Sequence, residues 1–201
     1  MTKKNYHHGD LKNALIQAGW KILAREGVGG LSLRKVAQEA GVSHAAPYAH
    51  FADKQALIAA ISTDGFSQLY ERLSQVAAQH QSQPREQLIE TAWAYLQFAQ
   101  ANPDRFKLMF SGVLEKEKDY PEFVEISYRN LGLIVSIVEA CQAVGVLRPG
   151  PAEAIAISVW SLVHGFVLLL LEGQIPHTLF EKTSLREAFL VSLAQVLLPE
   201  P

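Results

Sequence analysis

The sequence predicts an all-α protein with a small N-terminal three-helix domain, residues 1–54, and a larger helical domain, residues 55–201. Apolar residues recur at helical spacing through nearly the whole chain, and no stretch alternates as a half-buried strand does. Capping residues, glycines and prolines separate these periodic segments. Hydrophobic residues make up 49% and charged residues 19% of the 201 residues, which is typical of a globular chain and argues against disorder.

The first predicted helix covers residues 10–26. Asp10 is a suitable N-cap, and Gly27 suits the left-handed position just past the C-terminus. We expect the apolar stripe of this helix to pack against Val36 and Phe51 of the next segment. Six residues at helical spacing form the stripe: Leu11, Ala14, Leu15, Ala18, Ile22 and Leu23.

The segment from Leu31 to Lys54 predicts a helix-turn-helix. Ser32 is a good N-cap for the first short helix, and Gly41 can supply the left-handed residue that ends it. Ser43 can then cap a second helix. Two short helices joined by a turn that contains glycine form the motif whose second helix enters the major groove of DNA.

Asp53 is the expected N-cap of a third helix, with Lys54 in its first turn. The exposed amides and the positive end of the helix dipole suit a phosphate, and Lys54 adds a full charge. Residues 1–54 also hold eight Lys/Arg against four Asp/Glu, whereas residues 55–201 hold ten against sixteen. The excess of positive charge therefore coincides with the motif, as binding to phosphates requires.

Residues 42–54 resemble the DNA-binding domain of TetR-family transcriptional regulators, in which this region typically has the pattern V-S-x-x-x-x-Y-x-H-F-x-x-K. The positions of the pattern are filled by Val42, Ser43, Tyr48, His50, Phe51 and Lys54. The resemblance implies that Arg34 and His44 read bases. It further implies that five residues contact phosphates: Ser32, Ser43, Tyr48, His50 and Lys54. Lys35 and Ala45 complete the expected set of DNA-binding residues.

Two residues depart from the family pattern. Pro47 lacks the amide that would bond to the carbonyl of Ser43, so we expect the second helix to begin as a 3₁₀ turn or a kink. Ala49 stands where family members often have a large or basic side chain, so one DNA contact is expected to be missing.

Residues 1–9 form a basic arm that could lie along a phosphate backbone or reach a minor groove. His7 and His8 offer the alternative of a metal site. No third ligand lies nearby in the sequence, so we prefer the basic arm.

The rest of the chain continues as helices. The pattern that begins at Lys54 runs to about His80, a length that would carry this helix out of the DNA-binding domain and into the next one. Residues 112–121 form a charged connector to which no function is assigned. Further helices are expected over residues 85–101, 103–110, 122–144, 154–171 and 184–198.

Residues 154–171 carry no formal charge and approach the length of a membrane span. Ser158 and His164 interrupt the run, and no Lys or Arg flanks it closely to set a topology. The preferred alternative is a helix buried on two sides, against its own domain and against a partner subunit. We therefore expect no membrane, and a homodimer formed by the two C-terminal helices as a four-helix bundle.

A second resemblance lies in the same helix. Trp160, His164 and Gly165 are similar to the W-x-x-x-H-G signature of one C-terminal domain type of TetR-like regulators. The spacing places Trp160 and His164 on one helix face, either in a ligand cavity, at a dimer seam, or in the core. The expected effector site combines these two residues with aromatic and apolar side chains of the central helices: Trp93, Phe98, Phe106, Met109, Phe110, Phe123 and Tyr128. Ordinary core packing is the alternative for these side chains.

The chain has a single cysteine, Cys141, so no intrachain disulfide can form, and a reducing cytoplasm is expected. Cys141 lies in an apolar helical run without a neighbouring base, which favours a buried thiol over a redox sensor. The N-terminus lacks the apolar region of a signal peptide.

The resemblance implies a homodimer on a double-stranded, palindromic DNA operator, released by a small-molecule effector that is hydrophobic or aromatic. Repression is the family's usual mode of action, and activation is the alternative. The sequence has no nucleophile beside a base, no metal-ligand spacing and no glycine-rich phosphate loop. We therefore expect no catalytic residue, no metal and no cofactor.

Overall fold

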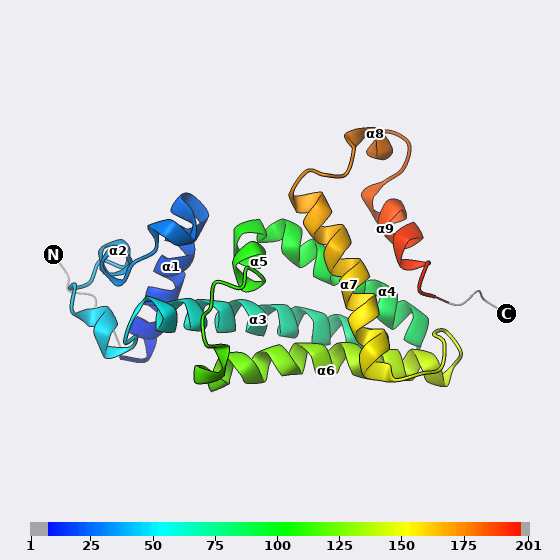
Figure 1. Ribbon diagram of the computed structural model, residues 1–201, viewed down its shortest axis with the longest axis horizontal. Helices are drawn as coiled ribbons and strands as arrows, with labels where there is room; N and C mark the ends of the chain where they lie inside the picture. Colours follow the sequence, from blue (N-terminus) through cyan, green and yellow to red (C-terminus); the bar gives the residue numbers. More distant parts are fainter. Residues whose placement is uncertain (1–7, 198–201) are drawn as a thin grey trace. The chain divides into compact units, whose positions relative to one another are not determined.

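The computed structural model describes residues 8–197, and within this range the chain consists of helices, turns and loops, without a strand (Figure 1). The prediction of an all-α fold is confirmed. In chain order the helices are α1 (His8–Gly30), α2 (Leu33–Glu39), α3 (Lys54–Gln79), α4 (Pro84–Ala101), α5 (Pro103–Met109), α6 (Pro121–Ala143), α7 (Ala152–Leu171), α8 (His177–Phe180) and α9 (Leu185–Leu193), with 3₁₀ turns η1 (Ala46–Ala49) and η2 (Glu117–Asp119).

The chain divides by its contacts into two compact units. The first comprises the chain up to residue 67 together with residues 104–126, and the second comprises residues 68–103 and the chain from residue 127 onward. This grouping does not follow the expected domain boundary at residue 54, because the beginning of α3, α5 and the beginning of α6 group with the N-terminal helices. A functional boundary at residue 54 stays a prediction.

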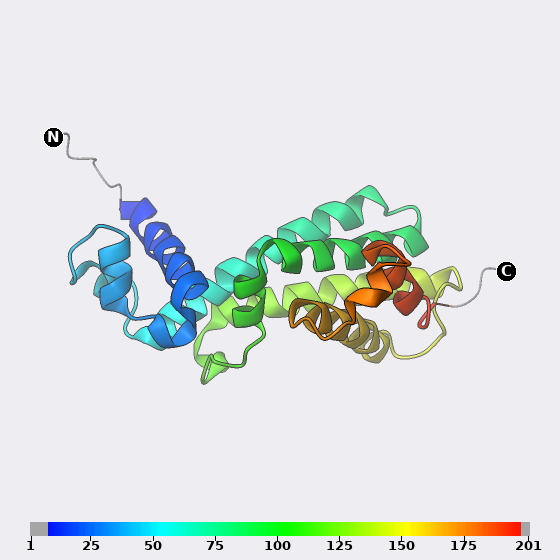
Figure 2. The same ribbon diagram turned by 90° about the horizontal axis from the view of Figure 1, so that it is seen from above.

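The first unit has its core between α1, α2 and the segment after η1. Helix α2 packs against both α1 and η1 (Figure 2). Leu15, Ile22, Val36 and Phe51 are each at most 2% exposed, as the predicted stripe and its two partners require. The burial of these side chains stabilises the unit by the hydrophobic effect.

Both predicted ends of the first helix need correction. Helix α1 includes His8, so Asp10 lies inside the helix and is not its N-cap. Gly27 is left-handed as expected, with φ 66°, but the chain resumes helical geometry after this kink and continues to Gly30. The basic arm and the pair His7–His8 fall largely on residues 1–7, which lie outside the described residues.

In the second unit, α4, α7 and α9 contact one another, and α9 lies beside α7 (Figure 2). The side chain of Gln87 donates to the carbonyl of Ala77 at 2.8 Å and ties the beginning of α4 to the end of α3. Helix α9 starts with a capping box, in which Ser184 and Glu187 satisfy each other's backbone amides. It ends at Leu193, earlier than the expected residue 198, and α8 was not anticipated.

Helix α7 is long and apolar enough to cross a bilayer by length and composition alone, as core helices of soluble proteins also can be. Its apolar window has a mean hydropathy of 2.3, and 22% of that window is buried within the described chain. Most of this apolar window is therefore not buried within the described chain.

Cys141 is fully buried in α6, as expected of a structural thiol. Its Sγ lies 3.1 Å from the carbonyl oxygen of Pro84. Burial raises the pKa of the thiol to about 11, so Cys141 is protonated and unreactive at neutral pH.

Candidate DNA-binding surface and effector cavity

The turn between α2 and η1 has the geometry that the sequence predicts. The hydroxyl of Ser32 accepts from the amide of Lys35 and caps α2. At the other end, Gly41 has φ 69° and donates to the carbonyl of Gln38, while the next amide, of Val42, donates to Ala37. These two bonds are those of a Schellman motif, which turns the chain sharply after α2.

The second element of the motif is the 3₁₀ turn η1 rather than an α-helix. Ala46 donates to the carbonyl of Ser43 and Tyr48 to that of Ala45, both three residues back. Pro47 has no amide for the bond four residues back, so the chain takes the tighter 3₁₀ geometry there. Ser43 is therefore not the N-cap that we expected; Ala45 occupies this position, without a capping side chain.

The predicted DNA-contacting residues form a solvent-accessible set along α2, the turn and η1. Tyr48 is 61% exposed, while Pro47 beside it is buried. Ser32, His50 and Lys54 are half-buried, and the other members are exposed: Arg34, Lys35, Ser43, His44 and Ala45. Their contacts with DNA stay predictions.

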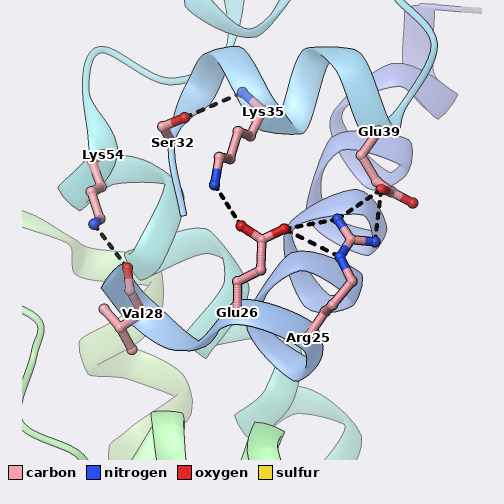
Figure 3. A network of polar contacts seen from close by, with 7 residues as sticks. All are labelled: Arg25, Glu26, Val28, Ser32, Lys35, Glu39 and Lys54. Carbon is pink, nitrogen blue, oxygen red and sulfur yellow. Dashed lines mark hydrogen bonds and ion pairs between the residues drawn. The ribbon is translucent and has the colours of Figure 1, made fainter. Parts of the chain in front are cut away.

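A network of charged side chains joins α1 to α2 next to this surface (Figure 3). Lys35 forms an ion pair with Glu26, and Arg25 bridges Glu26 and Glu39 at 3.1 and 3.3 Å. Hydrogen bonds from Lys35 and then from Arg25 hold the pKa of Glu26 below its ordinary value, so this carboxylate is charged at neutral pH. One of the predicted DNA-binding cations, Lys35, is thus held by an acidic neighbour.

Lys54 has a comparable internal contact. Asp53 caps α3 by accepting from the amide of Ala56 at 2.8 Å, as predicted. The ammonium group of Lys54 donates to the carbonyl of Val28 at 2.9 Å (Figure 3). An ammonium group has three donors, so this bond and a phosphate contact are compatible.

The residues predicted to bind an effector are divided between the two units. Phe106, Phe110 and Phe123 lie in the first unit, where Phe106 and Phe123 are buried and Phe66 contacts Phe110 and Phe123 edge-on at ring distances of 5.1 and 5.7 Å. Met109 is also buried in this unit.

The remaining candidates lie in the second unit but differ in their surroundings. Trp93 packs against Phe189 with ring centroids 5.7 Å apart, and Phe98 is buried. Tyr128 is 70% exposed, which is unlike a cavity residue. That these side chains contact an effector stays a prediction.

The second unit contains an apolar cavity of about 40 Å³. It lies between the end of α3 and helices α4, α6 and α7, and Trp160 is the candidate residue that lines it. Ten described residues line the cavity, and none of them is charged: Leu73, Leu88, Thr91, Ala92, Tyr95, Ile134, Ile137, Val159, Trp160 and Val163.

A hydrogen-bonded group of three side chains stands at this cavity. The indole of Trp160 donates to the hydroxyl oxygen of Tyr95 at 3.2 Å, and Nδ1 of His164 lies 2.7 Å from the same oxygen. Burial lowers the pKa of His164, so its ring is neutral at neutral pH. In the neutral tautomer that is protonated at Nε2, the hydroxyl of Tyr95 donates to Nδ1.

Thr91 and Tyr95 are polar residues of this site that the sequence did not predict. They lie four residues apart on α4, which also contributes Leu88 and Ala92 to the cavity wall. A threonine on an apolar face is a signal that could have drawn attention, but the partnership of Tyr95 with His164 spans 69 residues and depends on the tertiary fold.

Two family models match the chain. The model of bacterial regulatory proteins of the tetR family matches residues 15–61, and the model of the tetracyclin repressor-like C-terminal domain matches residues 88–193. A comparison with curated proteins finds no match.

Several solved structures share this fold. A protein of unknown function from Rhodococcus sp. RHA1 is 32% identical, with a TM-score of 0.80 over 96% of this chain and 97% of that chain. A TetR family transcription regulator from Marinobacter aquaeolei VT8 is 19% identical, with a TM-score of 0.71 over 94% and 96% of the two chains. The TetR family regulator PfmR from Thermus thermophilus is 19% identical, with a TM-score of 0.65 over 90% and 93%.

The helix-turn-helix unit and the helical C-terminal unit define the class: this is an all-α, DNA-binding transcriptional regulator. The chain belongs to the TetR family, because one family model alone covers more than half of it. The finer resemblance of Trp160, His164 and Gly165 to the W-x-x-x-H-G type stays a prediction.

Proposed function

We propose that the protein is a repressor that binds a palindromic operator as a homodimer and leaves it when a small hydrophobic effector binds. The observation that carries this proposal is the pairing, in one chain, of an exposed polar surface on a helix-turn-helix with an apolar cavity in the other unit. The first suits DNA and the second suits a small apolar molecule.

The DNA-binding part of the proposal assigns base reading to Arg34 and His44. Both side chains are exposed, on α2 and on the turn before η1. Phosphate contacts are assigned to residues near Arg34 and His44 in the sequence, whose side chains offer hydroxyl, imidazole or ammonium groups. These residues are Ser32, Lys35, Ser43, Tyr48, His50 and Lys54.

The homodimer is proposed to form through α7 and α9, which contact each other. Ile157 is 50%, Leu169 is 51% and Val191 is 66% exposed, a large apolar content for a surface in water. A Cβ built at Gly165 would meet no atom within 4 Å, so this face of α7 has room for a closely packed partner helix. An isologous pair of such faces gives a four-helix bundle.

Helix α3 connects the two activities. It begins at Lys54, next to the helix-turn-helix, and contributes Leu73 to the cavity wall. A dimer presents two copies of the motif to major grooves about 34–36 Å apart, so a shift of α3 that changes this spacing weakens binding. The effector can weaken DNA binding only if it binds the conformer with the changed spacing more tightly than the DNA-binding conformer.

Activation of transcription by the same DNA contacts is the alternative outcome. A promoter that becomes more active when the protein binds would favour it over repression. As a DNA-binding regulator the protein is proposed to work in the cytoplasm.

The test is a fluorescence-anisotropy titration against the DNA upstream of the protein's own gene, at two salt concentrations. We expect saturation at two chains per site and binding that survives competitor DNA. Tyr48→Ala should weaken binding by roughly tenfold, and Arg34→Ala by a similar factor with relaxed base preference.

Two variants serve as matched controls. Tyr128→Ala removes a tyrosine that is 70% exposed on α6, and Arg72→Ala removes an exposed arginine on α3 outside the motif. Both should bind the DNA as the wild type does. If Tyr48→Ala and Arg34→Ala also bound like the wild type, the assignment of the DNA-binding surface would be wrong.

A further inference from the structure

The side chains that line the cavity of the second unit are uncharged and mainly apolar. The surface that faces the cavity is almost entirely apolar, and the lining residues that carry a polar group are Thr91, Tyr95 and Trp160. A charged ligand would lose its hydration there without gaining an ionic partner among the described lining residues. The walls therefore favour a neutral guest.

The hydroxyl of Thr91 is a buried polar group without a hydrogen-bond partner among the described residues. Thr91 is 5% exposed, and its Oγ1 has no hydrogen-bond partner among the described residues. A buried threonine in a helix commonly bonds to the carbonyl four residues back, here that of Gln87, and Oγ1 does not do so. Leaving a buried hydroxyl unpaired is costly, so a guest that supplies its partner gains affinity.

The hydroxyl of Tyr95 plays a different part. It accepts from Trp160 and is hydrogen-bonded to His164, so its partners hold it in place beside the cavity. Thr91, one helical turn away on α4, has a hydroxyl without a partner among the described residues, which can bond to a ligand atom when the space beside α4 widens.

The size of the cavity limits the guest and links it to movement. A volume of about 40 Å³ accommodates a few water molecules, whereas a cavity that holds benzene measures about 150 Å³. Any organic guest must therefore widen the space between α3, α4, α6 and α7. Close-packed helices resist this, so the guest must be compact and must bind the wider conformer better.

We infer that this cavity binds a compact, neutral, mainly hydrophobic molecule with one hydroxyl or carbonyl group, and that Thr91 recognises that group. The inference rests on the proposed function, in which the cavity is the effector site. It adds the chemical class of the effector and the residue that selects it.

The probes are p-cresol and p-xylene, which have nearly the same shape and differ by a hydroxyl in place of a methyl group. Binding to the full-length protein is measured by titration calorimetry. We expect p-cresol to bind about threefold to tenfold more tightly than p-xylene, the range of one neutral hydrogen bond.

Thr91→Val and Thr91→Ser are the variants that assign this preference. Valine keeps the shape of the side chain but removes the hydroxyl, so p-cresol should lose its advantage over p-xylene. Serine keeps the hydroxyl and should retain the advantage. Since Thr91→Val removes an unpaired buried polar atom, its melting temperature should not fall, and circular dichroism checks that both variants are folded.

Equal binding of the two probes to the wild type would overturn the inference, as would failure of both to bind or an undiminished preference in Thr91→Val. Operator binding is measured on the same samples by anisotropy without probe. Normal operator binding with no preference for p-cresol means that the inference alone fails. Loss of operator binding with the expected preference means that the proposed function fails while the cavity chemistry stands.

Discussion

The hydroxyl oxygen of Tyr95 on α4 lies 2.7 Å from Nδ1 of His164 on α7, and the indole of Trp160 donates to the same oxygen. In the neutral tautomer of His164 that is protonated at Nε2, Nδ1 accepts the proton of the Tyr95 hydroxyl. The bond can exist in this direction only while Nδ1 is unprotonated. It therefore ties the packing of two helices of the second unit to the charge state of one histidine.

The stability of the protein should fall in mild acid through His164. Burial lowers the pKa of His164 in the folded chain, so near pH 6.5 and below the unfolded chain binds more protons. The free energy of unfolding is then highest above about pH 6.5 and decreases as the pH falls toward the lower folded pKa. Urea unfolding of the wild type at about pH 7.5 and about pH 5.5 measures this loss.

His164→Asn isolates the contribution of this histidine from that of the others. The amide oxygen of asparagine can accept from Tyr95 without titrating in this range. The variant should lose less stability than the wild type between the two pH values. An equal loss would mean that other groups cause the acid sensitivity.

Much of the fold was accessible from local sequence signals. The bounds of α3, α4 and α6 lie within a residue or two of the predicted ones, since each helix has a long apolar period and a clear stop. The errors lie at both ends of α1, at the end of α9, and at the short elements α8 and η1. At η1 a single residue decides the geometry. Pro47 removed the amide on which an α-helical second element depended, and the N-cap moved from Ser43 to Ala45.

The cavity was harder to predict from the sequence than the helices were, for a physical reason. Aromatic residues on the central helices suggested a site, but in the first unit Phe110 and Phe123 pack with Phe66, and Phe106 packs with Phe110. Periodicity shows that a side chain faces inward, and it cannot show which inward residues meet. Thr91 was identified only from the structure, in which its hydroxyl is buried without a partner among the described residues.

Gly41→Ala should destabilise the helix-turn-helix. Gly41 has φ 69°, and a Cβ in this region is disfavoured by about 1–2 kcal/mol even though no atom within 4 Å would obstruct it. Gly29→Ala is the control, since Gly29 is an exposed helical residue with equal room and no positive φ. Urea unfolding should show a loss for the first variant and none for the second. Equal stability of the two would argue against a strained turn.

Glu26→Gln should strengthen DNA binding. The change releases Lys35 from its ion pair and makes its ammonium group available to a phosphate. We expect a roughly twofold to tenfold rise in operator affinity, and a steeper dependence of log affinity on log salt by about 0.9, since one more counterion is released. Anisotropy titrations at several salt concentrations measure both.

Glu39→Gln is the matched control for this change. Glu39 binds Arg25 and not Lys35, so its replacement removes the same negative charge without releasing the lysine. The control should have a smaller effect on affinity and on the salt dependence. If both variants behaved alike, net charge rather than Lys35 would explain the gain.

Val191→Glu should convert the proposed dimer into a monomer. Val191 is 66% exposed on α9, and a carboxylate buried against its own copy would lack a partner and meet a like charge. Val144→Glu, at a site 60% exposed just beyond α6, is the control and should remain dimeric. Light scattering after size exclusion gives the mass of each. Because two motifs must reach successive grooves together, the monomer should also bind the operator at least about tenfold more weakly. A dimeric Val191→Glu with full affinity would place the interface elsewhere than α7 and α9.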